Sequence, residues 1–368
     1  GHHADQCRGH GDDSRRATVV QRVPGRGQES EHAVAQEPDG QGSRARGHES
    51  HPVTGVGLTE ICGFNRLEVS GDDAETFLDR MICGRFPRRS SRVGLAYLLN
   101  HHGMVKAEAT LANLPESPSG PARIWYGSSA ASEAHDMDWL EAHLRPDENV
   151  QVRSLTNEWT ILLLAGPKSR NVLSAAARGD WSAAAFPWLS VREAFIGIAP
   201  AVVMAVSYSG ELAYEIHVPN AQLHAAYLAL KRAGDPLGLT LFGGRAIDSM
   251  RIEKGFLHWK ADLLTEFDPF ETGLDRFVSL DKPDFVGKAG LHQRVSEGAR
   301  KRLVTLAVDC ADRPAHPGAS VMHEGKVVGT VTSGEWGHRT GLNLALAFVQ
   351  PDHAAPGSTV TLDLLGTA

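Results

Sequence analysis

The first 57 residues of the 368-residue chain contain no Leu, Ile, Met, Phe, Tyr, Trp or Lys. Leu58 is the first leucine and Lys106 is the first lysine. A segment without large hydrophobic side chains cannot bury enough apolar surface to offset the entropy of ordering its backbone. We therefore expect residues 1–56 to be a disordered, low-complexity leader, and we expect the folded region to begin near Gly57.

Charge and hydropathy exclude several classes of protein. The net charge of −7 predicts no nucleic-acid partner. The uncharged stretch between Glu193 and Glu211 contains Gly197 and Pro200, which favours two strands around a turn over a membrane span. The N-terminus lacks the apolar core of a signal peptide, and the four cysteines show no CxxC spacing. We therefore expect a cytoplasmic protein with reduced thiols and no metal site.

Beyond Gly57 the sequence alternates between helical and strand patterns. Apolar residues three or four positions apart predict helices at 72–82, 132–144 and 221–233, the last capped by Asn220. Segments 58–71 and 92–114 indicate strand pairs, the second around a turn at 100–103. From Lys301 onward, short strands between Gly and Pro turns predict a separate β-barrel or β-sandwich. The residues alone thus indicate an α+β protein, without dinucleotide-binding, Walker A, zinc-protease or esterase motifs.

Seven segments occur in the order and spacing of one known family. They are VSGDDAETFLDRMI (69–82), YLLNHHGMVKAEATL (97–111), LAGPKSRNVL (164–173), SYSGELAYEIHVP (207–219), RAIDSMRIEKG (245–255), DPFETGLDRFVSLDKPDFVGKAGL (268–291) and GTVTSGEWGH (329–338). Together they resemble the aminomethyltransferase family of the glycine-cleavage T-protein, most of all the folate-binding C-terminal part of dimethylglycine and sarcosine dehydrogenases.

The resemblance covers residues 57–365 and implies an α+β, three-domain cloverleaf around a central channel that holds tetrahydrofolate. On this basis residues 57–295 form the folate-binding region of two interleaved α+β subdomains, and residues 301–368 form the C-terminal β-barrel. The leader replaces an ordered region of the relatives, and the chain stops at Ala368 before the last expected barrel strand. We therefore expect a truncated barrel with an exposed edge.

The resemblance also implies a catalytic residue. The family places a catalytic Asp in the segment after its Asn-x-x-Gly turn, and Glu108 stands at that position here. A carboxylate beside the folate amines can accept a proton as the new carbon–nitrogen bond forms. Glu108 would do so with one more methylene of reach. The alternative is an ordinary solvent-facing strand glutamate.

The same resemblance implies the folate contacts. In the family a Glu accepts two hydrogen bonds from the pterin amide edge, and the matching residue is Glu215. Tyr208 is expected to line the same channel. Glu211 is either a further polar contact or a turn residue, and Trp259 is either a channel residue or a core residue. Trp336 is expected to cap the channel.

These residues predict an enzyme that moves a one-carbon unit onto tetrahydrofolate. Its donor would be a methylated amine such as dimethylglycine or sarcosine, and its product 5,10-methylene-tetrahydrofolate. Because the flavin-binding half of the relatives has no counterpart here, a separate flavin-dependent amine oxidase is the expected partner. The alternatives are a demethylase of sulfonium or aryl methyl ether donors, a non-catalytic folate-binding protein, and an inactive fragment.

Overall fold

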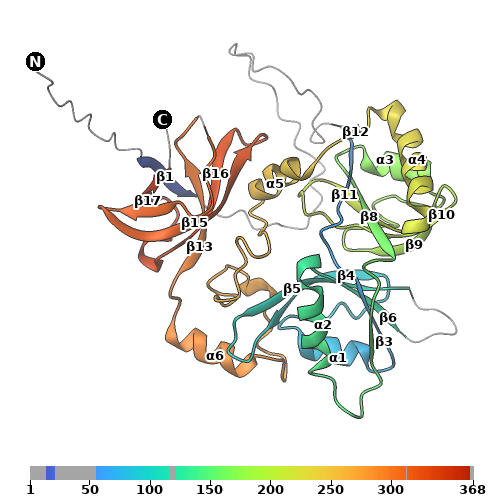
Figure 1. Cartoon of the computed structure of the whole chain (residues 1–368), viewed down its shortest axis with the longest axis horizontal. Helices are drawn as coiled ribbons and strands as arrows, with labels where there is room; N and C mark the ends of the chain where they lie inside the picture. Colours follow the sequence, from blue (N-terminus) through green and yellow to red (C-terminus); the bar gives the residue numbers. More distant parts are fainter. Residues whose placement is uncertain (1–13, 21–54, 116–121, 312, 365–368) are drawn as a thin grey trace, which may run out of the picture.

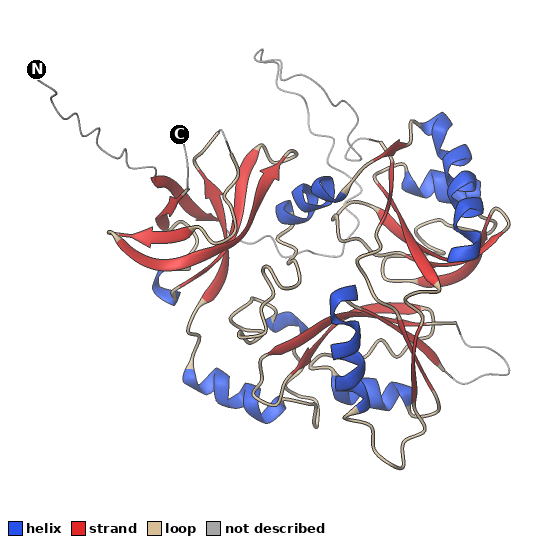
Figure 2. Ribbon diagram, in the orientation of Figure 1, coloured by secondary structure: helices blue, strands red, loops and turns tan. Residues whose placement is uncertain are grey.

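The computed structural model describes residues 14–20, 55–115, 122–311 and 313–364 (Figure 1). Their strands form a five-stranded sheet, a six-stranded sheet and a closed six-stranded barrel. Figure 2 shows these as three lobes, two of them with helices against a sheet and one built of strands. The fold is α+β, as the sequence predicts, and its C-terminal β-structure is a closed barrel.

The first lobe holds the five-stranded sheet and two helices. Its elements are β3 (Leu67–Ser70), β4 (Arg92–Leu99), β5 (Val105–Asn113), β6 (Arg123–Gly127), β7 (Gln151–Ser154), α1 (Ala74–Met81) and α2 (Glu133–Glu141). The predicted apolar face of α1, with Phe77 and Met81, is fully buried against this sheet. The predicted hairpin is also confirmed, because β4 pairs antiparallel with β5.

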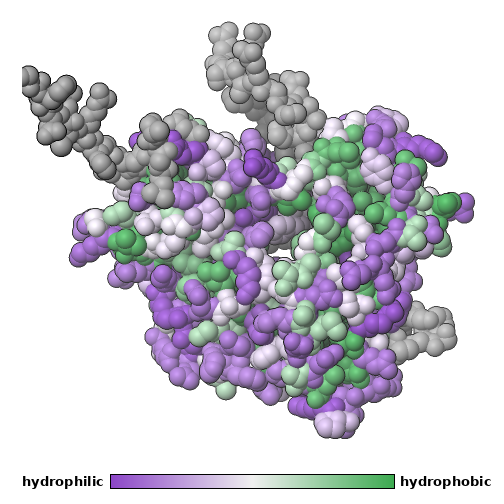
Figure 3. Space-filling view, viewed as in Figure 1, coloured by the Kyte–Doolittle hydropathy of each residue, from purple (hydrophilic) through white to green (hydrophobic). Residues whose placement is uncertain are grey.

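The second lobe holds the six-stranded sheet. Its elements are β2 (Gly57–Glu60), β8 (Trp159–Ala165), β9 (Val191–Ile196), β10 (Ala199–Met204), β11 (Ala213–Pro219), β12 (Thr240–Leu241), α3 (Ser169–Ala176) and α4 (Leu223–Gly234). Figure 3 shows hydrophobic patches over this lobe. Its most exposed large hydrophobic side chains are Phe195, Ile198 and Leu241.

Two local predictions in this region are wrong. The strands predicted in 58–71 both exist, but β2 pairs with β8 and β3 pairs with β6, so the chain crosses between lobes instead of turning back. Asn220 does not cap α4, because its amide oxygen accepts from Thr160 and its nitrogen donates to the Asn157 carbonyl. A short 3₁₀ turn (Asn220–Gln222) leads into the helix instead.

The barrel corrects the expectation of a wholly disordered leader. Its strands are β1 (Ser14–Val20), β13 (Arg302–Val308), β14 (Ser320–His323), β15 (Lys326–Gly337), β16 (Leu342–Val349) and β17 (Thr359–Asp363). β1 pairs with both β13 and β17, so the expected open edge is absent from this described part of the chain. Ala17 and Val19 alternate into the barrel core at 1% and 3% exposure. β1 contributes only small apolar side chains to this core. Backbone pairing with β13 on one side and β17 on the other holds the strand in place. Gly55 and Val56, the last two residues of the predicted leader, are also described, and Val56 is buried in the core of the second lobe. The other residues of the predicted leader lie outside the described residues.

Two further helices and two shared cores join the lobes. α5 (Gly244–Glu253) lies between the second lobe and the barrel, and α6 (Lys288–Glu297) precedes the barrel (Figure 1). One core unites residues of β4 and β5 with residues of β13 and β16, and another unites β5 and β6 with β10. In the described ranges, no helix is long and apolar enough to cross a membrane.

Candidate active site

Glu108 projects from β5 on the face away from α1. Its neighbours Ala107 and Ala109 lie in the core beneath that helix, and side chains alternate along a strand. Burial raises the pKa of the Glu108 carboxyl to about 7, and a hydrogen bond with the Tyr97 side chain opposes the rise. Tyr97 stands directly opposite on β4. A carboxyl with this pKa can both take up and release a proton near neutral pH.

Glu215 projects from β11 toward the first lobe. It stands opposite Met204 of β10, and directly opposed residues share one face of a sheet. Met204 belongs to the hydrophobic cluster that also contains Ala112 of β5 and Trp125 of β6. Ala112 lies an even number of positions from Glu108 and therefore on the same face of β5. The two glutamates thus project from the facing surfaces of the two sheets.

The environment of Glu215 combines burial with a nearby positive charge. Its side chain is 18% exposed. Burial raises the pKa of the Glu215 carboxyl to about 7, and the charge of Arg66 opposes this rise. His217, two positions along the same strand, places its Nε2 3.4 Å from Glu215 Oε2. Arg66 contacts the other ring nitrogen of His217, Nδ1. A buried carboxyl, an imidazole and a guanidinium therefore form one row.

Tyr208 lies where the lobes meet. Its hydroxyl donates to the Leu257 carbonyl over 3.1 Å. Burial raises the pKa of the Tyr208 phenol, and the negative charges of Glu108 and Asp262 raise it further, while Arg251 opposes them. The Tyr208 ring, carried by the second lobe, is thus within electrostatic range of the Glu108 carboxylate on the first. The structure brings together these two sequence-predicted residues.

A buried ion pair links the barrel to the region around Glu108, Glu215 and Tyr208, which we call the centre. Arg251 of α5 lies 2.7 Å from Asp262 through Nη1 and Oδ2, and both side chains are almost completely buried. Asp262 also accepts hydrogen bonds from the hydroxyls of Thr332 and Ser333 on β15. The backbone N–H of His258 donates to the same carboxylate. The Asp262 carboxylate therefore links α5, the loop that follows it and strand β15 of the barrel.

The two predicted tryptophans make polar contacts between elements. Trp259 Nε1 donates to Ser132 Oγ over 2.9 Å, which ties the loop after α5 to the first lobe. Trp336 is half-buried, and its backbone carbonyl accepts a hydrogen bond from Ser249 of α5. Both residues therefore lie at junctions between lobes, on segments that border the centre.

Glu211 takes part in a contact between the second lobe and the barrel. Its two carboxylate oxygens lie 3.0 and 3.2 Å from the guanidinium of Arg339. Burial raises the pKa of Glu211, and Arg339 opposes that rise. The sequence leaves two roles open for Glu211, a further polar contact in the channel or a turn residue. Its pairing with Arg339 favours the structural role of a turn residue.

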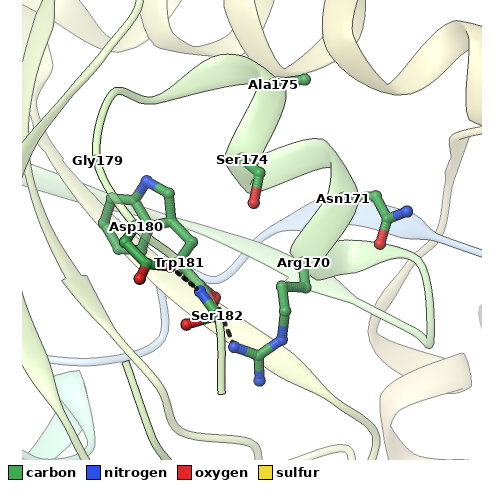
Figure 4. Close-up of a pocket in the computed structure, with 8 residues that line it drawn as sticks. All are labelled: Arg170, Asn171, Ser174, Ala175, Gly179, Asp180, Trp181 and Ser182. Carbon is green, nitrogen blue, oxygen red and sulfur yellow. Dashed lines mark hydrogen bonds between the residues drawn. The ribbon is translucent and has the colours of Figure 1, made fainter. Parts of the chain in front are cut away.

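A separate surface depression lies beside α3 (Figure 4). Arg170 crosses it and donates to the Trp181 carbonyl over 2.6 Å. Its lining contains none of the predicted site residues and consists of Arg170, Asn171, Ser174, Ala175, Gly179, Asp180, Trp181 and Ser182. The candidate site is therefore defined by the facing glutamates and not by this depression. Over the described residues, no group of three His, Cys, Asp or Glu side chains could hold a metal ion.

Sequence reasoning missed Arg66 and His217. His217 could have been found, because it follows Glu215 by two positions on a predicted strand and so shares its face. Arg66 lies 151 positions from His217 and carries no local signal of that contact. The role of Asp262 at the centre was likewise invisible, since its partners come from α5 and from the barrel.

The family follows from sequence profiles that match most of the chain. The GCVT N-terminal domain matches residues 42–282, and the glycine cleavage T-protein C-terminal barrel domain matches residues 301–368. The chain belongs to the glycine-cleavage T-protein family. The resemblance that the seven segments indicated is thereby confirmed.

Relatives in the T-protein family include both longer and similar-sized proteins. Rat mitochondrial dimethylglycine dehydrogenase is 31% identical over 313 residues, which are 84% of this chain and 36% of that protein. This chain thus spans about a third of the length of that relative. The aminomethyltransferase of Bacillus subtilis (strain 168) is 28% identical over 316 residues, 84% of each chain. The crystal structure of the glycine cleavage system aminomethyltransferase T from Bartonella henselae superposes with a TM-score of 0.74, 22% identity and 86% coverage of both chains.

Proposed function

We propose that this member of the T-protein family is a tetrahydrofolate-dependent one-carbon transferase. Its donor would be a methylated amine such as dimethylglycine or sarcosine, and its product 5,10-methylene-tetrahydrofolate. The observation that carries the proposal is the pair of partly buried glutamates, Glu108 and Glu215, on facing sheets, each with the pKa of its carboxyl raised to about 7 by burial. Perturbed carboxyls in one enclosed place are typical of catalytic sites.

The residues present fit a reduced folate. A pterin ring offers adjacent N–H donors along its amide edge, and the Glu215 side chain is 18% exposed. A carboxylate in that setting can accept two such hydrogen bonds at once, and charge-assisted pairs are strong. Tetrahydrofolate, when bound, would supply the nucleophilic amine that takes up the one-carbon unit. Glu215 would fix the orientation of that amine.

Glu108 is the proposed proton acceptor. Its pKa of about 7 leaves a substantial ionised fraction at neutral pH. The ionised carboxylate can accept the proton that leaves a reacting amine and can return it to solvent or product. Tyr97, which hydrogen-bonds the Glu108 side chain from the neighbouring strand, would hold the carboxylate in one orientation.

Aromatic residues complete the proposed binding region. Tyr208, Trp259 and Trp336 border the centre from the second lobe, the loop after α5 and the barrel. We propose that they exclude water and contact the folate rings. Residues 57–295 would then be the folate-binding region, and residues 301–368 the barrel domain, completed by β1. Glu211, paired with Arg339, would link the lobes.

A partner enzyme is part of the proposal. The chain covers 36% of rat dimethylglycine dehydrogenase, and oxidation of an amine requires an electron acceptor. We propose that a separate flavin-dependent amine oxidase generates the activated donor, which this chain then transfers to folate. A small-molecule donor that is already activated would remove the need for that partner.

The test couples this protein to a flavoenzyme that oxidises dimethylglycine in the presence of tetrahydrofolate. We expect the oxidised methyl carbon to appear as 5,10-methylene-tetrahydrofolate, with free formaldehyde falling in proportion. Glu108→Gln should lower the captured share toward that of the flavoenzyme alone. An unchanged share with wild-type protein would refute the proposal. Formation of 5-methyl-tetrahydrofolate from a sulfonium or aryl methyl ether would instead support the demethylase alternative.

A further inference from the structure

His217 occupies a buried position between a positive and a negative group. The residue is 4% exposed and Arg66 is 3% exposed. The guanidinium of Arg66 contacts His217 through Nη2 and Nδ1. Because a guanidinium has donors and no acceptor, Nδ1 must be the accepting nitrogen of the ring. The neutral imidazole then carries its one proton on Nε2.

The electrostatics agree with this tautomer. Burial, and then the adjacent positive charge of Arg66, hold the pKa of His217 well below its usual range. The ring is therefore neutral at physiological pH and cannot donate from both nitrogens. Contact with Arg66 thus determines which nitrogen of His217 is the donor.

The Nε2–H of His217 faces Glu215. The Nε2–Oε2 separation is 3.4 Å, and among the described residues this nitrogen has no hydrogen-bond partner. A buried donor without a partner is rare in folded proteins. The Glu215 carboxylate is an acceptor 3.4 Å from this nitrogen, and rotation of the glutamate side chain would bring the two atoms to hydrogen-bond distance.

On the two described strands that flank β11, no charged side chain stands directly opposite Glu215. Leu163 of β8 and Met204 of β10 stand opposite Glu215 on the two neighbouring strands, and both are apolar. Arg66, from the first lobe, is the residue whose charge favours the ionised Glu215. The guanidinium lies 5.1 Å from the centre of the Trp125 ring, which holds it in place.

We propose that His217 is a positioning residue for Glu215. Held by Arg66, it presents Nε2–H to one carboxylate oxygen and so favours the ionised form of the carboxyl and aligns it for the amide edge of a pterin. The role of the carboxylate as a folate ligand rests on the proposed function, whereas its coupling to His217 and Arg66 does not.

The first test measures the coupling without any ligand. Full-length protein labelled with ¹³C at the glutamate carboxyls is titrated by NMR, and Glu215→Gln identifies the Glu215 signal. His217→Phe removes the donor, and we expect the midpoint of the Glu215 titration to rise by about one pH unit. His217→Gln can place an amide N–H near the position of Nε2 and should keep the wild-type midpoint. An unchanged midpoint in His217→Phe would overturn the proposal.

A second variant guards against a misfolded His217→Phe. Arg66→Gln retains a donor for Nδ1 while it removes the charge, so the Glu215 midpoint should also rise. A midpoint that stays at the wild-type value would overturn the role of Arg66. Circular dichroism of each variant checks that the fold is retained.

The second test uses 5-formyltetrahydrofolate as the probe in calorimetry between about pH 5.5 and pH 8.5. Affinity should fall as pH decreases through the Glu215 midpoint, and in His217→Phe this fall should begin at a higher pH. A purely structural role would lower affinity equally at every pH, which would contradict the proposal. Absence of folate binding by wild-type protein, with the NMR shift present, would refute the proposed function and leave the coupling intact.

Discussion

The backbone N–H of Val19 donates a hydrogen bond to the carbonyl of Ser358 over 2.9 Å. In return, the Val19 carbonyl accepts from the N–H of Gly357 over 2.8 Å. Residues near the two ends of the chain are thus adjacent in the barrel, where β1 lies between β17 and β13. The barrel is closed by a segment that precedes the rest of the fold by dozens of residues.

Removal of β1 should therefore open the barrel. A deletion of residues 1–20 leaves β13 and β17 as free edges and exposes the core side of Leu306 and Leu362, which are fully buried in the intact chain. We expect the melting temperature to fall by at least about 5 °C and aggregates to form. Deletion of residues 1–13, which retains β1, is the matched control. Equal melting temperatures for the two deletions would contradict this role of β1.

The buried carboxylate of Asp262 should be essential to stability. Asp262→Ala leaves the Arg251 guanidinium buried without its partner, and a broken buried pair costs about 3–5 kcal/mol of unfolding free energy. Asp248 is the other ion-pair partner of Arg251, and the Asp248 side chain is 45% exposed. Asp248→Ala should therefore cost less than about 1 kcal/mol of unfolding free energy. Urea denaturation of both variants measures the difference. Similar losses in the two would show that Asp262 does not hold the centre together.

The raised pKa of Glu108 predicts a pH-dependent stability. The folded-state pKa of about 7 exceeds the ordinary value of 4.5, so the folded protein binds more protons than the unfolded chain between those pH values. Stability of the ligand-free protein therefore falls as pH rises from about 4.5 through 7.

Glu108→Gln removes that dependence. At about pH 8 the variant should gain roughly 1–3 kcal/mol in unfolding free energy, and near pH 4.5 it should match the wild type. Its transfer rate should fall by roughly 10²- to 10⁴-fold, as expected for loss of a general base. Denaturation at both pH values and single-turnover rates measure these effects. A variant destabilised at high pH would show that burial does not disfavour the Glu108 anion.

Gly103 should tolerate no side chain, for two separable reasons. Its φ of +79° disfavours other residues, and an added Cβ would lie 2.3 Å from the backbone nitrogen of Leu291 in α6. Gly238 has a similar φ of +80°, but a Cβ added to Gly238 would have no atom within 4 Å. Gly238→Ala should cost about 1–2 kcal/mol from the backbone alone, and Gly103→Ala clearly more. Equal losses in thermal denaturation would show that the turn is not pressed against α6.

The hairpin that carries Glu108 could be predicted because its signals are local. Asn100 accepts hydrogen bonds from the backbone N–H groups of His102 and Met104 through its side-chain oxygen, and Gly103 supplies the positive φ. Such turn chemistry is recognisable from four residues. Alternation of small and polar side chains then places Glu108 on the face of β5 that points away from α1.

The strand β1 and the row from Arg66 to Glu215 could not be predicted in this way. Ala17 and Val19 resemble the rest of a poorly apolar leader, and only pairing with β13 and β17 makes them part of a core. Arg66 and His217 meet across two lobes. Residue types and spacing carry no information on contacts of that range, so family resemblance identified Glu215 but not the groups that act on it.

The most direct measurement of the central claim is calorimetric titration with tetrahydrofolate at about pH 8. Wild-type protein should bind, and Glu215→Gln should bind at least about 30-fold more weakly, because a charge-assisted hydrogen-bond pair is lost. Glu193→Gln replaces an exposed glutamate of the same sheet, and its affinity should match that of the wild type. If Glu215→Gln binds tetrahydrofolate as tightly as the wild type, or if wild-type protein does not bind it, the account is wrong.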